Sequence, residues 1–381
     1  MKNKIWLSSP HMGGNEMKYV NEAYDTNWIA PLGPNVNGFE HDLENYIGEN
    51  SKVACLSSGT AAIHIALILA GVGHEDEVIC QSFTFAASAN PIKYQGATPV
   101  FVDSEKETWN LCPVALETAI KDRMVKGKKP KAIIAVHLYG MPAKILEIAA
   151  IAKKYNIVLI EDAAEALGST YQGQKCGTFG DFGILSFNGN KIITTSGGGA
   201  LVCNNEKDKQ KAIFLATQAR DNAPHYQHSE IGYNYRMSNI LAGIGRGQME
   251  VLDQHVALRR KMHQFYQEVF KEVKGVTVFS EPTTDFASNH WLSCVLIDSE
   301  ITGFNRETLR LTLLEDNIES RPLWKPMHLQ PVFKDYTIYG KGVAENLFQK
   351  GLCLPSGSNL TDEDRSRILN SIRQLLVKFS K

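Results

Sequence analysis

Between residues 53 and 162 the sequence alternates short apolar runs with segments of helical periodicity. Strands are expected at 53–56, 77–80, 99–103, 132–137 and 157–162, and helices at 60–70, 84–95, 113–125 and 143–154. Right-handed crossover units on a mostly parallel sheet produce this alternation. The sequence therefore predicts a large α/β domain.

The alternation ends after two further apolar runs, at 182–187 and 199–203. A helical stretch from 242 to about 273 follows and is expected to span two domains. Beyond it, a strand-like run at 291–297 mixes with helical segments at 306–316, 345–350 and 362–379, which indicates a smaller α+β domain.

The length of the chain also favours two domains, because single hydrophobic cores stop growing beyond about 250 to 300 residues and this chain has 381. We predict a large domain at 1–253 and a small domain at 254–381. The first 50 residues are expected to form an N-terminal arm followed by one helix, with an irregular segment at 26–34 because of its prolines and glycine.

The net charge of −1 gives no electrostatic argument for binding nucleic acid or an anionic membrane. The N-terminus has no signal-peptide pattern, and no apolar run approaches the roughly 20 residues of a membrane-spanning helix. Seven cysteines, scattered without C-x-x-C spacing, are typical of reduced thiols. We therefore expect a cytoplasmic protein without a metal site and without nucleic-acid or membrane partners.

The first motif with chemical meaning is the turn at 57–62, Ser-Ser-Gly-Thr-Ala-Ala, between a predicted strand and a predicted helix. The first N–H groups of a helix are unpaired, and its dipole favours an anion. Gly59 lets the backbone approach a ligand, while Ser58 and Thr60 offer hydroxyl donors. The turn indicates a phosphate site, although an ordinary helix cap is the simpler explanation when the turn is considered alone.

A carboxylate stands at the end of a later strand. Asp162 ends the apolar run 157–162, and ligands collect at the carboxyl ends of strands in parallel sheets. A carboxylate that faces a pyridine nitrogen keeps the ring protonated, so that the ring accepts electrons. Capping of the following helix is the competing interpretation of Asp162.

Lys191 follows the apolar run 182–187, with Ser186 and three glycines at 197–199 beside it. Turn, carboxylate and lysine are three fixed points, and they suffice to position pyridoxal 5′-phosphate. We predict that Lys191 forms a Schiff base with this cofactor. Phe85 follows another strand and would stack on the cofactor ring, but a core position explains it equally well.

Four ordered segments resemble the DegT/DnrJ/EryC1/StrS family of pyridoxal phosphate-dependent sugar aminotransferases: 57–62, 161–168, 186–191 with 197–199, and 232–236 with 248–249. Within that family, segments 10–16, 188–191 and 321–328 resemble the UDP-N-acetylbacillosamine transaminases. The resemblance implies fold type I of the pyridoxal phosphate-dependent transferases, which is similar to aspartate aminotransferase. It also implies a homodimer with active sites at the interface.

The resemblance implies a role for individual residues. Lys191 would form the Schiff base and shuttle protons, and Asp162 would face the pyridinium nitrogen. The implied cofactor contacts are Ser58, Gly59, Thr60, Phe85, Asp162, Glu165, Ser186 and, from the neighbouring subunit, Asn234. The implied substrate contacts are Asn27, Trp28, Ile29, Ala30, Arg321, Lys325, Pro326, Met327 and His328. Glu165 departs from many relatives, which have glutamine or histidine there, and a surface position explains His328 equally well.

The implied reaction is a ping-pong transfer of an amino group from L-glutamate, which leaves as 2-oxoglutarate, to C4 of a UDP-4-keto-6-deoxy-N-acetylhexosamine. The expected product is the UDP-4-amino-4,6-dideoxy sugar of the D-gluco series, for glycan biosynthesis. Alternatives are the L-altro series that leads to pseudaminic acid, another nucleotide sugar, or a pyridoxamine phosphate-dependent dehydratase, against which Lys191 argues. A non-catalytic nucleotide-binding regulator is disfavoured because G-x-G-x-x-G after the first strand and a P-loop motif are both missing.

Overall fold

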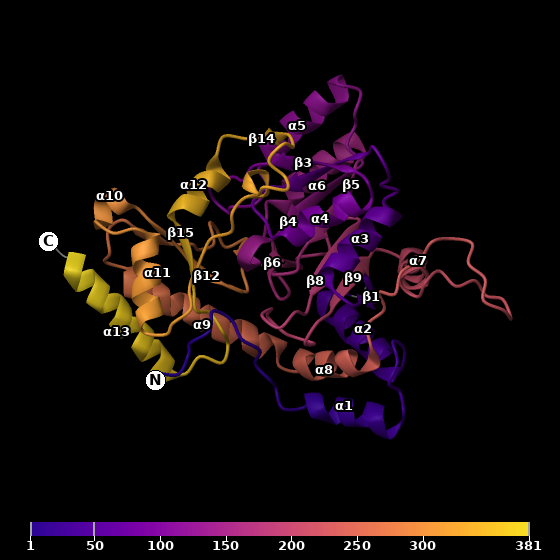
Figure 1. Ribbon diagram of the computed structural model, residues 1–381, viewed down its shortest axis with the longest axis horizontal. Coiled ribbons are helices and arrows are strands. Elements are labelled where there is room, and N and C mark those ends of the chain that lie inside the picture. Colours follow the sequence, from indigo (N-terminus) through magenta and orange to yellow (C-terminus); the bar gives the residue numbers. More distant parts are fainter. Residues whose placement is uncertain (1, 49, 380–381) are drawn as a thin grey trace.

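A computed structural model describes residues 2–48 and 50–379. The described chain forms a large part around an eight-stranded sheet and a smaller part beside it, with helix α9 (Leu252–Phe270) running from one to the other (Figure 1). No helix among the described residues is long and apolar enough to cross a membrane. The predicted division at 253/254 falls in the first turn of α9, and it stays a proposal.

The large sheet is mostly parallel, as predicted. Its strands follow one another in the order β1 (Lys52–Leu56), β9 (Gly199–Cys203), β8 (Phe182–Ser186), β5 (Val158–Asp162), β4 (Ala132–Val136), β2 (Glu77–Gln81), β3 (Thr98–Val102) and β14 (Ile338–Tyr339). β9 runs antiparallel to both β1 and β8, and the other neighbours are parallel. The carboxyl ends of β1, β2, β5 and β8 therefore share one edge of the sheet.

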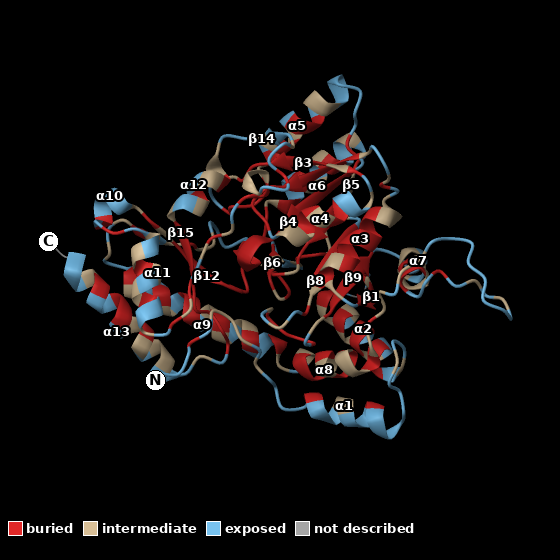
Figure 2. Cartoon of the chain, viewed as in Figure 1, coloured by how far each residue is buried: buried red, intermediate tan, exposed pale blue. Residues whose placement is uncertain are grey.

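Helices cover both faces of this sheet, so its strands are mostly buried and apolar, except the edge strand β14, where Ile338 is exposed (Figure 2). Helices α3 (Gly59–Leu69), α4 (Ala86–Tyr94) and α7 (Glu206–Ala216) pack into the core on one face. Helices α5 (Pro113–Val125) and α6 (Ile145–Tyr155) pack into the core on the other. The predicted strands and helices of this part exist, with ends shifted by one or two residues.

The small part has a four-stranded antiparallel sheet in the order β10 (Val276–Val278), β12 (Ser293–Ile297), β15 (Gly351–Leu354), β13 (Arg321–Pro322). Its helices are α10 (Ser299–Thr302), α11 (Arg306–Glu315), α12 (Val343–Lys350) and α13 (Asp362–Phe379). The remaining short elements are strands β6 (Thr170–Tyr171), β7 (Gln174–Lys175) and β11 (Phe286–Ala287), and 3-10 turns at Leu138–Gly140 and Met327–Leu329. This α+β composition agrees with the sequence-based prediction.

The N-terminal arm belongs to the small part at its start. Ile5 pairs with Ile318 and is buried in the core that contains α11 and α13. Leu7 accepts a hydrogen bond from the N–H of Ser356, 2.8 Å away. The chain therefore begins on the small part and crosses to the large part before α1 (Glu16–Asp25).

Two predictions about helices were wrong. The first 50 residues contain two helices, α1 and α2 (Pro34–Ile47), because Gly33 adopts φ +140° and Pro34 starts a new helix. The single helix expected at 242–273 is two helices, α8 (Asn239–Met249) and α9, separated at Val251, which has non-helical φ and ψ.

The glycines of α8 let it pack closely against α1 and α2. A Cβ on Gly245 would lie 2.7 Å from the ring of Phe39 in α2, and one on Gly247 would lie 2.7 Å from the backbone of Glu16 in α1. α8 therefore lies against α1 and α2 at a distance that only glycine allows.

Candidate active site

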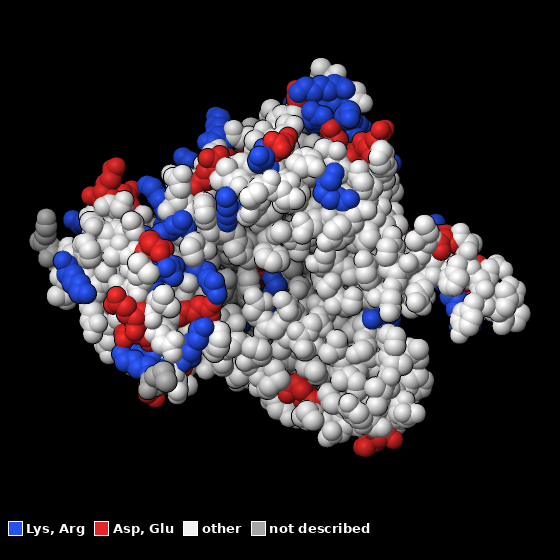
Figure 3. Space-filling view, viewed as in Figure 1, with Lys and Arg blue, Asp and Glu red and all other residues white. Residues whose placement is uncertain are grey.

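A cavity of about 290 Å³ lies at the edge of the sheet where β1, β2, β5 and β8 end. The space-filling view shows a hollow between the large and small parts of the molecule (Figure 3). Eight of the predicted residues line this cavity: Ser58, Gly59, Thr60, Phe85, Asp162, Glu165, Ser186 and Lys191. Trp291 and Trp324 line it as well, so segments far apart in the sequence supply one site.

Lys191 follows β8 in a turn closed by its own N–H, which donates to the carbonyl of Asn188 at 3.0 Å. Its side chain is only 12% exposed. The amine Nζ lies 3.3 Å from Oε1 of Glu165 and 4.2 Å from the centre of the Trp291 ring. The amine is therefore held between a carboxylate and an aromatic face inside the cavity.

Asp162 is the last residue of β5 and is buried. Its Oδ2 accepts a hydrogen bond from the hydroxyl of Ser88 at 2.6 Å, and its Oδ1 accepts one from the N–H of Ala164 at 3.2 Å. The Ser88 hydroxyl in turn lies 2.8 Å from that of Thr84. These contacts fix the orientation of the carboxylate at the cavity wall.

Glu165 is buried beside Lys191. Its Oε2 accepts a hydrogen bond from the backbone N–H of Tyr139 at 2.6 Å, and Tyr139 is held at φ +56°. Burial raises the pKa of Glu165 to about 7, and the charge of Asp162 adds to this, while Lys191 and the Tyr139 N–H act in the opposite direction. A carboxyl group with this pKa exchanges protons near neutral pH.

The predicted phosphate turn is the start of α3. Ser58 is its N-cap, with Oγ accepting the Ala61 N–H at 3.0 Å, so the competing interpretation as a helix cap is correct for this side chain. The first backbone N–H groups of α3 have no acceptor within the helix. They belong to the end of α3 that lines the cavity. A Cβ on Gly199 would lie 2.3 Å from the nitrogen of Gly59, so glycine lets β9 approach the turn.

The other predicted contacts do not line this cavity in the single chain. Asn234 is exposed. Asn27, Trp28 and Ile29 are exposed in the α1–α2 loop, which is held by Asn239: its side chain donates to the carbonyl of Trp28 at 3.1 Å, and its backbone N–H donates to that of Ala30 at 2.8 Å. Their assignment to cofactor and substrate stays a prediction.

Arg321 and Lys325 line a neighbouring cavity of about 600 Å³. This second cavity shares Phe85, Asn190, Trp291 and Trp324 with the first. The two cavities are therefore contiguous along a wall of aromatic side chains.

Pro326, Met327 and His328 are placed differently from Lys325. Pro326 and Met327 are buried. The His328 ring has both nitrogens engaged, Nδ1 with the Ser82 hydroxyl at 2.6 Å and Nε2 with the Glu345 carboxylate at 3.1 Å. His328 therefore links the end of β2 to α12. It lines neither the 290 Å³ nor the 600 Å³ cavity, so its predicted contact with substrate stays a prediction.

Sequence reasoning missed two tryptophans of the site. The indole N–H of Trp291 donates to the carbonyl of Asn190 at 2.6 Å, directly beside Lys191. The ring of Trp324 lies 5.4 Å from that of Phe85 and 6.2 Å from that of Trp291. Trp324 lies within segment 321–328, whose resemblance to the transaminases could have pointed to it. Trp291 could not be found in this way, because it lies in the run 291–297 that was predicted to be a strand of the small domain.

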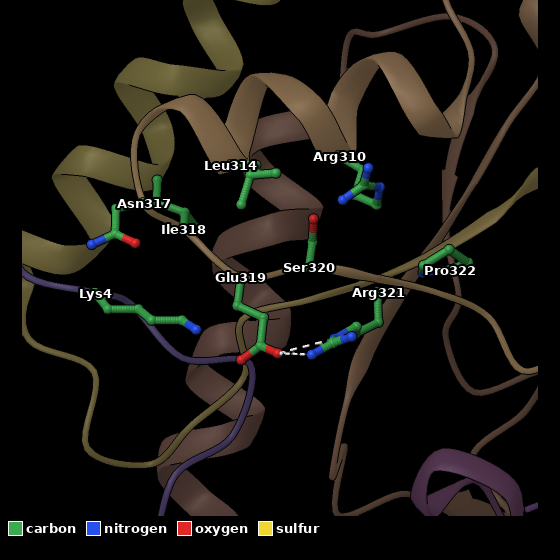
Figure 4. A pocket seen from close by; sticks show the side chains of 9 residues that line it. All are labelled: Lys4, Arg310, Leu314, Asn317, Ile318, Glu319, Ser320, Arg321 and Pro322. Carbon is green, nitrogen blue, oxygen red and sulfur yellow. Dashed lines mark hydrogen bonds and ion pairs between the residues drawn. The ribbon is translucent and has the colours of Figure 1, made fainter.

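A further cavity, of about 430 Å³, lies on the small part and is lined by residues of α11, β13 and the arm (Figure 4). Its Glu319 carboxylate is paired with Arg321. It does not reach the ends of β1, β5 or β8, where the lysine and the carboxylates meet, so we place the candidate active site in the 290 Å³ cavity.

Comparison with known proteins agrees with this geometry. Residues 10–373 match the model of the DegT/DnrJ/EryC1/StrS aminotransferase family. EpsN of Bacillus subtilis, described as a pyridoxal phosphate-dependent aminotransferase, is 51% identical over 98% of this chain and 96% of its own length. A GDP-perosamine synthase of Caulobacter vibrioides is 38% identical over 98% of this chain and 99% of its own length.

Among solved structures, the Streptococcus pneumoniae protein Spr1654, described as a sugar aminotransferase and solved in its pyridoxal phosphate form, superimposes with a TM-score of 0.88. It is 26% identical and covers 100% of both chains. The same fold therefore holds pyridoxal phosphate in a related protein.

Proposed function

Because this chain belongs to the DegT/DnrJ/EryC1/StrS aminotransferase family, whose cofactor is pyridoxal phosphate, we propose that it transfers an amino group from L-glutamate to C4 of a nucleotide-linked 4-keto-6-deoxy sugar. The observation that carries the proposal is the burial of Lys191 between Glu165 and Trp291, at the same sheet edge as Asp162 and the start of α3. Family and site independently point to transamination.

The residues of the cavity fit the cofactor. An oriented, buried carboxylate at Asp162 suits a protonated pyridine nitrogen. The start of α3, with Gly59, Thr60 and the nearby Ser186, suits a phosphate group. The amine of Lys191 is the nucleophile within the same cavity, and Phe85 is positioned at its rim to cover an aromatic ring.

When bound, pyridoxal phosphate supplies a carbonyl that carries the amino group and a ring that accepts electrons. The chain supplies proton transfer and orientation. Lys191 Nζ takes and returns a proton, and Glu165 Oε1, 3.3 Å away, holds that amine in place. Trp291 covers the amine on its other side and keeps bulk water from it.

We propose a homodimer with shared active sites. The α1–α2 region exposes a set of large apolar side chains: Met17, Tyr24, Trp28, Ile29 and Leu32, each more than 40% exposed. Contiguous exposed apolar surface of this kind marks an interaction site. The 218–235 loop extends away from the body of the large part (Figure 1), and Asn234 is exposed at its base, where it pairs with Thr217. An extended loop with an exposed amide at its base supports a contact with a second subunit.

For the acceptor, we propose a UDP-4-keto-6-deoxy-N-acetylhexosamine. The proposal is supported by the resemblance of segments 188–191 and 321–328 to the UDP-N-acetylbacillosamine transaminases. The 600 Å³ cavity beside the active site offers Lys325 and Arg321 for a diphosphate and aromatic rings for a base. A GDP-linked keto sugar is the second candidate, because three GDP-perosamine synthases are 35–38% identical over 97–98% of this chain.

The test incubates cofactor-loaded protein and L-glutamate with each keto sugar and measures 2-oxoglutarate and the sugar product. An amine product with one nucleotide sugar supports transamination and names the acceptor, and NMR of the product gives the configuration at C4. A deoxy-keto product without 2-oxoglutarate would establish dehydration instead. Lys191→Ala should abolish turnover and the visible absorbance of the loaded protein, and retained turnover would contradict the role of Lys191.

A further inference from the structure

Tyr139 makes hydrogen bonds to residues of both cavities, although its own side chain lines neither of them. It lies in the 3-10 turn that follows β4 and is 1% exposed. Its backbone N–H donates to Oε2 of Glu165 at 2.6 Å, and its hydroxyl accepts the backbone N–H of Trp324 at 2.9 Å. One buried residue therefore contacts a wall residue of the candidate active site on one side and a residue of the shared aromatic wall on the other.

The first of these hydrogen bonds acts on the partner of the reactive lysine. Glu165 Oε2 accepts the Tyr139 N–H, while Oε1 of the same carboxylate lies 3.3 Å from Nζ of Lys191. Because the donor is a backbone N–H, this bond depends on the conformation of the turn and not on the side chain at position 139. A substitution that preserves the turn therefore leaves the contact with Glu165 in place.

The second hydrogen bond acts on the wall between the two cavities. Trp324 lines both the 290 Å³ and the 600 Å³ cavity. Its ring lies 5.4 Å from that of Phe85 and 5.1 Å from that of Tyr139. Since the bond to the Trp324 N–H is made by the hydroxyl of Tyr139, it depends on the side chain.

The segment around Trp324 is anchored through its backbone. Leu323 donates its N–H to the carbonyl of the first residue of β15 at 3.1 Å, and Met327 donates its N–H to that of the residue after β2 at 2.8 Å. Between these two anchors, the hydroxyl of Tyr139 accepts the N–H of Trp324. It therefore fixes the part of the backbone that carries the indole ring.

The backbone of Tyr139 is held in an unusual conformation. Its φ of +56° is rare for a bulky side chain and persists only where the surroundings impose it. The flanking residues are tied down: the Leu138 N–H donates to Oδ1 of Asn110 at 2.9 Å, and the Gly140 carbonyl accepts the Ser169 hydroxyl at 2.7 Å. In this conformation the N–H and the hydroxyl of one residue reach two different walls.

We propose that Tyr139 is a positioning residue for the amino acceptor, because its hydroxyl holds the ring of Trp324 against the nucleotide-linked keto sugar. The inference rests on the proposed function, since it takes the 600 Å³ cavity as the site of that sugar nucleotide. The N–H of Tyr139 holds Glu165 independently of this role. Loss of the hydroxyl should therefore weaken acceptor binding and leave the reaction with L-glutamate intact.

Tyr139→Phe separates the two contacts, because phenylalanine keeps the ring and the N–H and removes only the hydroxyl. The experiment uses the full-length, cofactor-loaded protein with each of the two keto sugars named above. The KM for the acceptor should rise about fivefold or more, since a neutral hydrogen bond contributes about that factor. Both kcat and the rate of 2-oxoglutarate formation from L-glutamate without acceptor should equal those of the wild type.

Phe83→Leu is the control for a role in packing alone. The ring of Phe83 is buried against that of Tyr139, with centres 6.3 Å apart, so this substitution disturbs the packing of Tyr139 and keeps its hydroxyl. It should lower the temperature of unfolding and leave the acceptor KM unchanged. An equal rise of the acceptor KM in Phe83→Leu and Tyr139→Phe would show that packing is responsible and would overturn the inference.

Hydrogen–deuterium exchange, followed by mass spectrometry on peptides that contain Trp324, tests the same contact without turnover. Loss of the acceptor of the Trp324 N–H should speed its exchange about fivefold in Tyr139→Phe. Equal exchange in Tyr139→Phe and wild type, or an unchanged acceptor KM, would also overturn the inference. A wild type that forms no 2-oxoglutarate from L-glutamate would contradict the proposed function instead, and the exchange at Trp324 would then decide whether Tyr139 holds this residue.

Discussion

The amine of Lys191 and the carboxylate of Glu165 lie 3.3 Å apart in a buried cavity, and the burial raises the pKa of Glu165 to about 7. The reactive amine is thus paired with a carboxyl group that changes charge within the physiological pH range. This relationship leads to a prediction about stability that is independent of turnover.

In the cofactor-free protein, Glu165 should make stability fall as pH rises. The folded pKa of about 7 lies above the ordinary value of 4.5, so its contribution is complete below pH 4.5 and is lost as pH rises through 7. The loss amounts to about 3 kcal/mol at most, since each pKa unit corresponds to about 1.4 kcal/mol. Glu165→Gln should remove this slope from urea unfolding measured between pH 5 and 8. Glu75→Gln, at an exposed site, should retain it, and a slope unchanged in Glu165→Gln would refute the assignment.

Asp162→Asn should weaken cofactor binding and reduce turnover by a larger factor. The substitution keeps the shape of the side chain but removes the charge that we propose faces the pyridine nitrogen. Charge-assisted hydrogen bonds contribute about 1.5–3 kcal/mol, which corresponds to roughly a tenfold to hundredfold loss of affinity. Absorbance titration with pyridoxal phosphate measures it. Asp335→Asn, at an exposed position, is the matched control, and equal affinities in the two variants would contradict the prediction.

Trp291 should matter more to turnover through its ring than through its N–H. Trp291→Phe loses the hydrogen bond to Asn190, at a cost of about 1 kcal/mol of unfolding free energy, but keeps an aromatic face over Lys191. Trp291→Ala leaves a cavity as well and should cost about 3–5 kcal/mol. Urea denaturation measures both. Turnover of both variants is then compared. Equal losses in Trp291→Phe and Trp291→Ala would show that turnover does not depend on the contact of the ring with the Lys191 amine.

Gly199→Ala should distort the turn at the start of α3, our proposed phosphate site, although Gly199 lies outside that turn. The new Cβ would meet the Gly59 nitrogen at 2.3 Å, so β9 or the start of α3 has to move. Overpacking of this kind costs about 1–3 kcal/mol and should also lower cofactor affinity. Gly73→Ala is the control, because its Cβ would meet no atom within 4 Å. Thermal unfolding with and without pyridoxal phosphate separates the two effects.

Ile29→Asp should convert the proposed dimer to a monomer, because it places a charge in the apolar α1–α2 surface where Ile29 is 50% exposed. Val125→Asp, at a residue 88% exposed at the end of α5, should leave the assembly unchanged. Light scattering after gel filtration gives the mass of each variant. A wild-type monomer, or dissociation by Val125→Asp alone, would place the interface elsewhere or remove it.

The sequence was most informative for candidate site residues that lie at or shortly after the end of a strand. Asp162 ends β5 and Lys191 lies five residues after the end of β8, and parallel strands bring such positions to one edge, so their meeting could be predicted. Trp291 could not, because it joins the site only when α9 brings the small part against the large one. The break at Val251 was hidden too, since the apolar spacing continues through it and the glycine contacts with Phe39 are tertiary.

The N-terminal arm is held in position partly by backbone contacts with residues in the last third of the chain. Ile5 exchanges backbone hydrogen bonds with Asn317 and Glu319, and Ser8 donates to the Asn190 carbonyl next to Lys191. On the ribosome, Ile5 emerges more than 300 residues before Asn317 and Glu319, so at usual elongation rates it waits roughly 15–60 seconds for them, whereas Ser8 emerges 182 residues before Asn190. The arm at the rim of the candidate active site is thus fixed in place only after residues synthesised much later have folded.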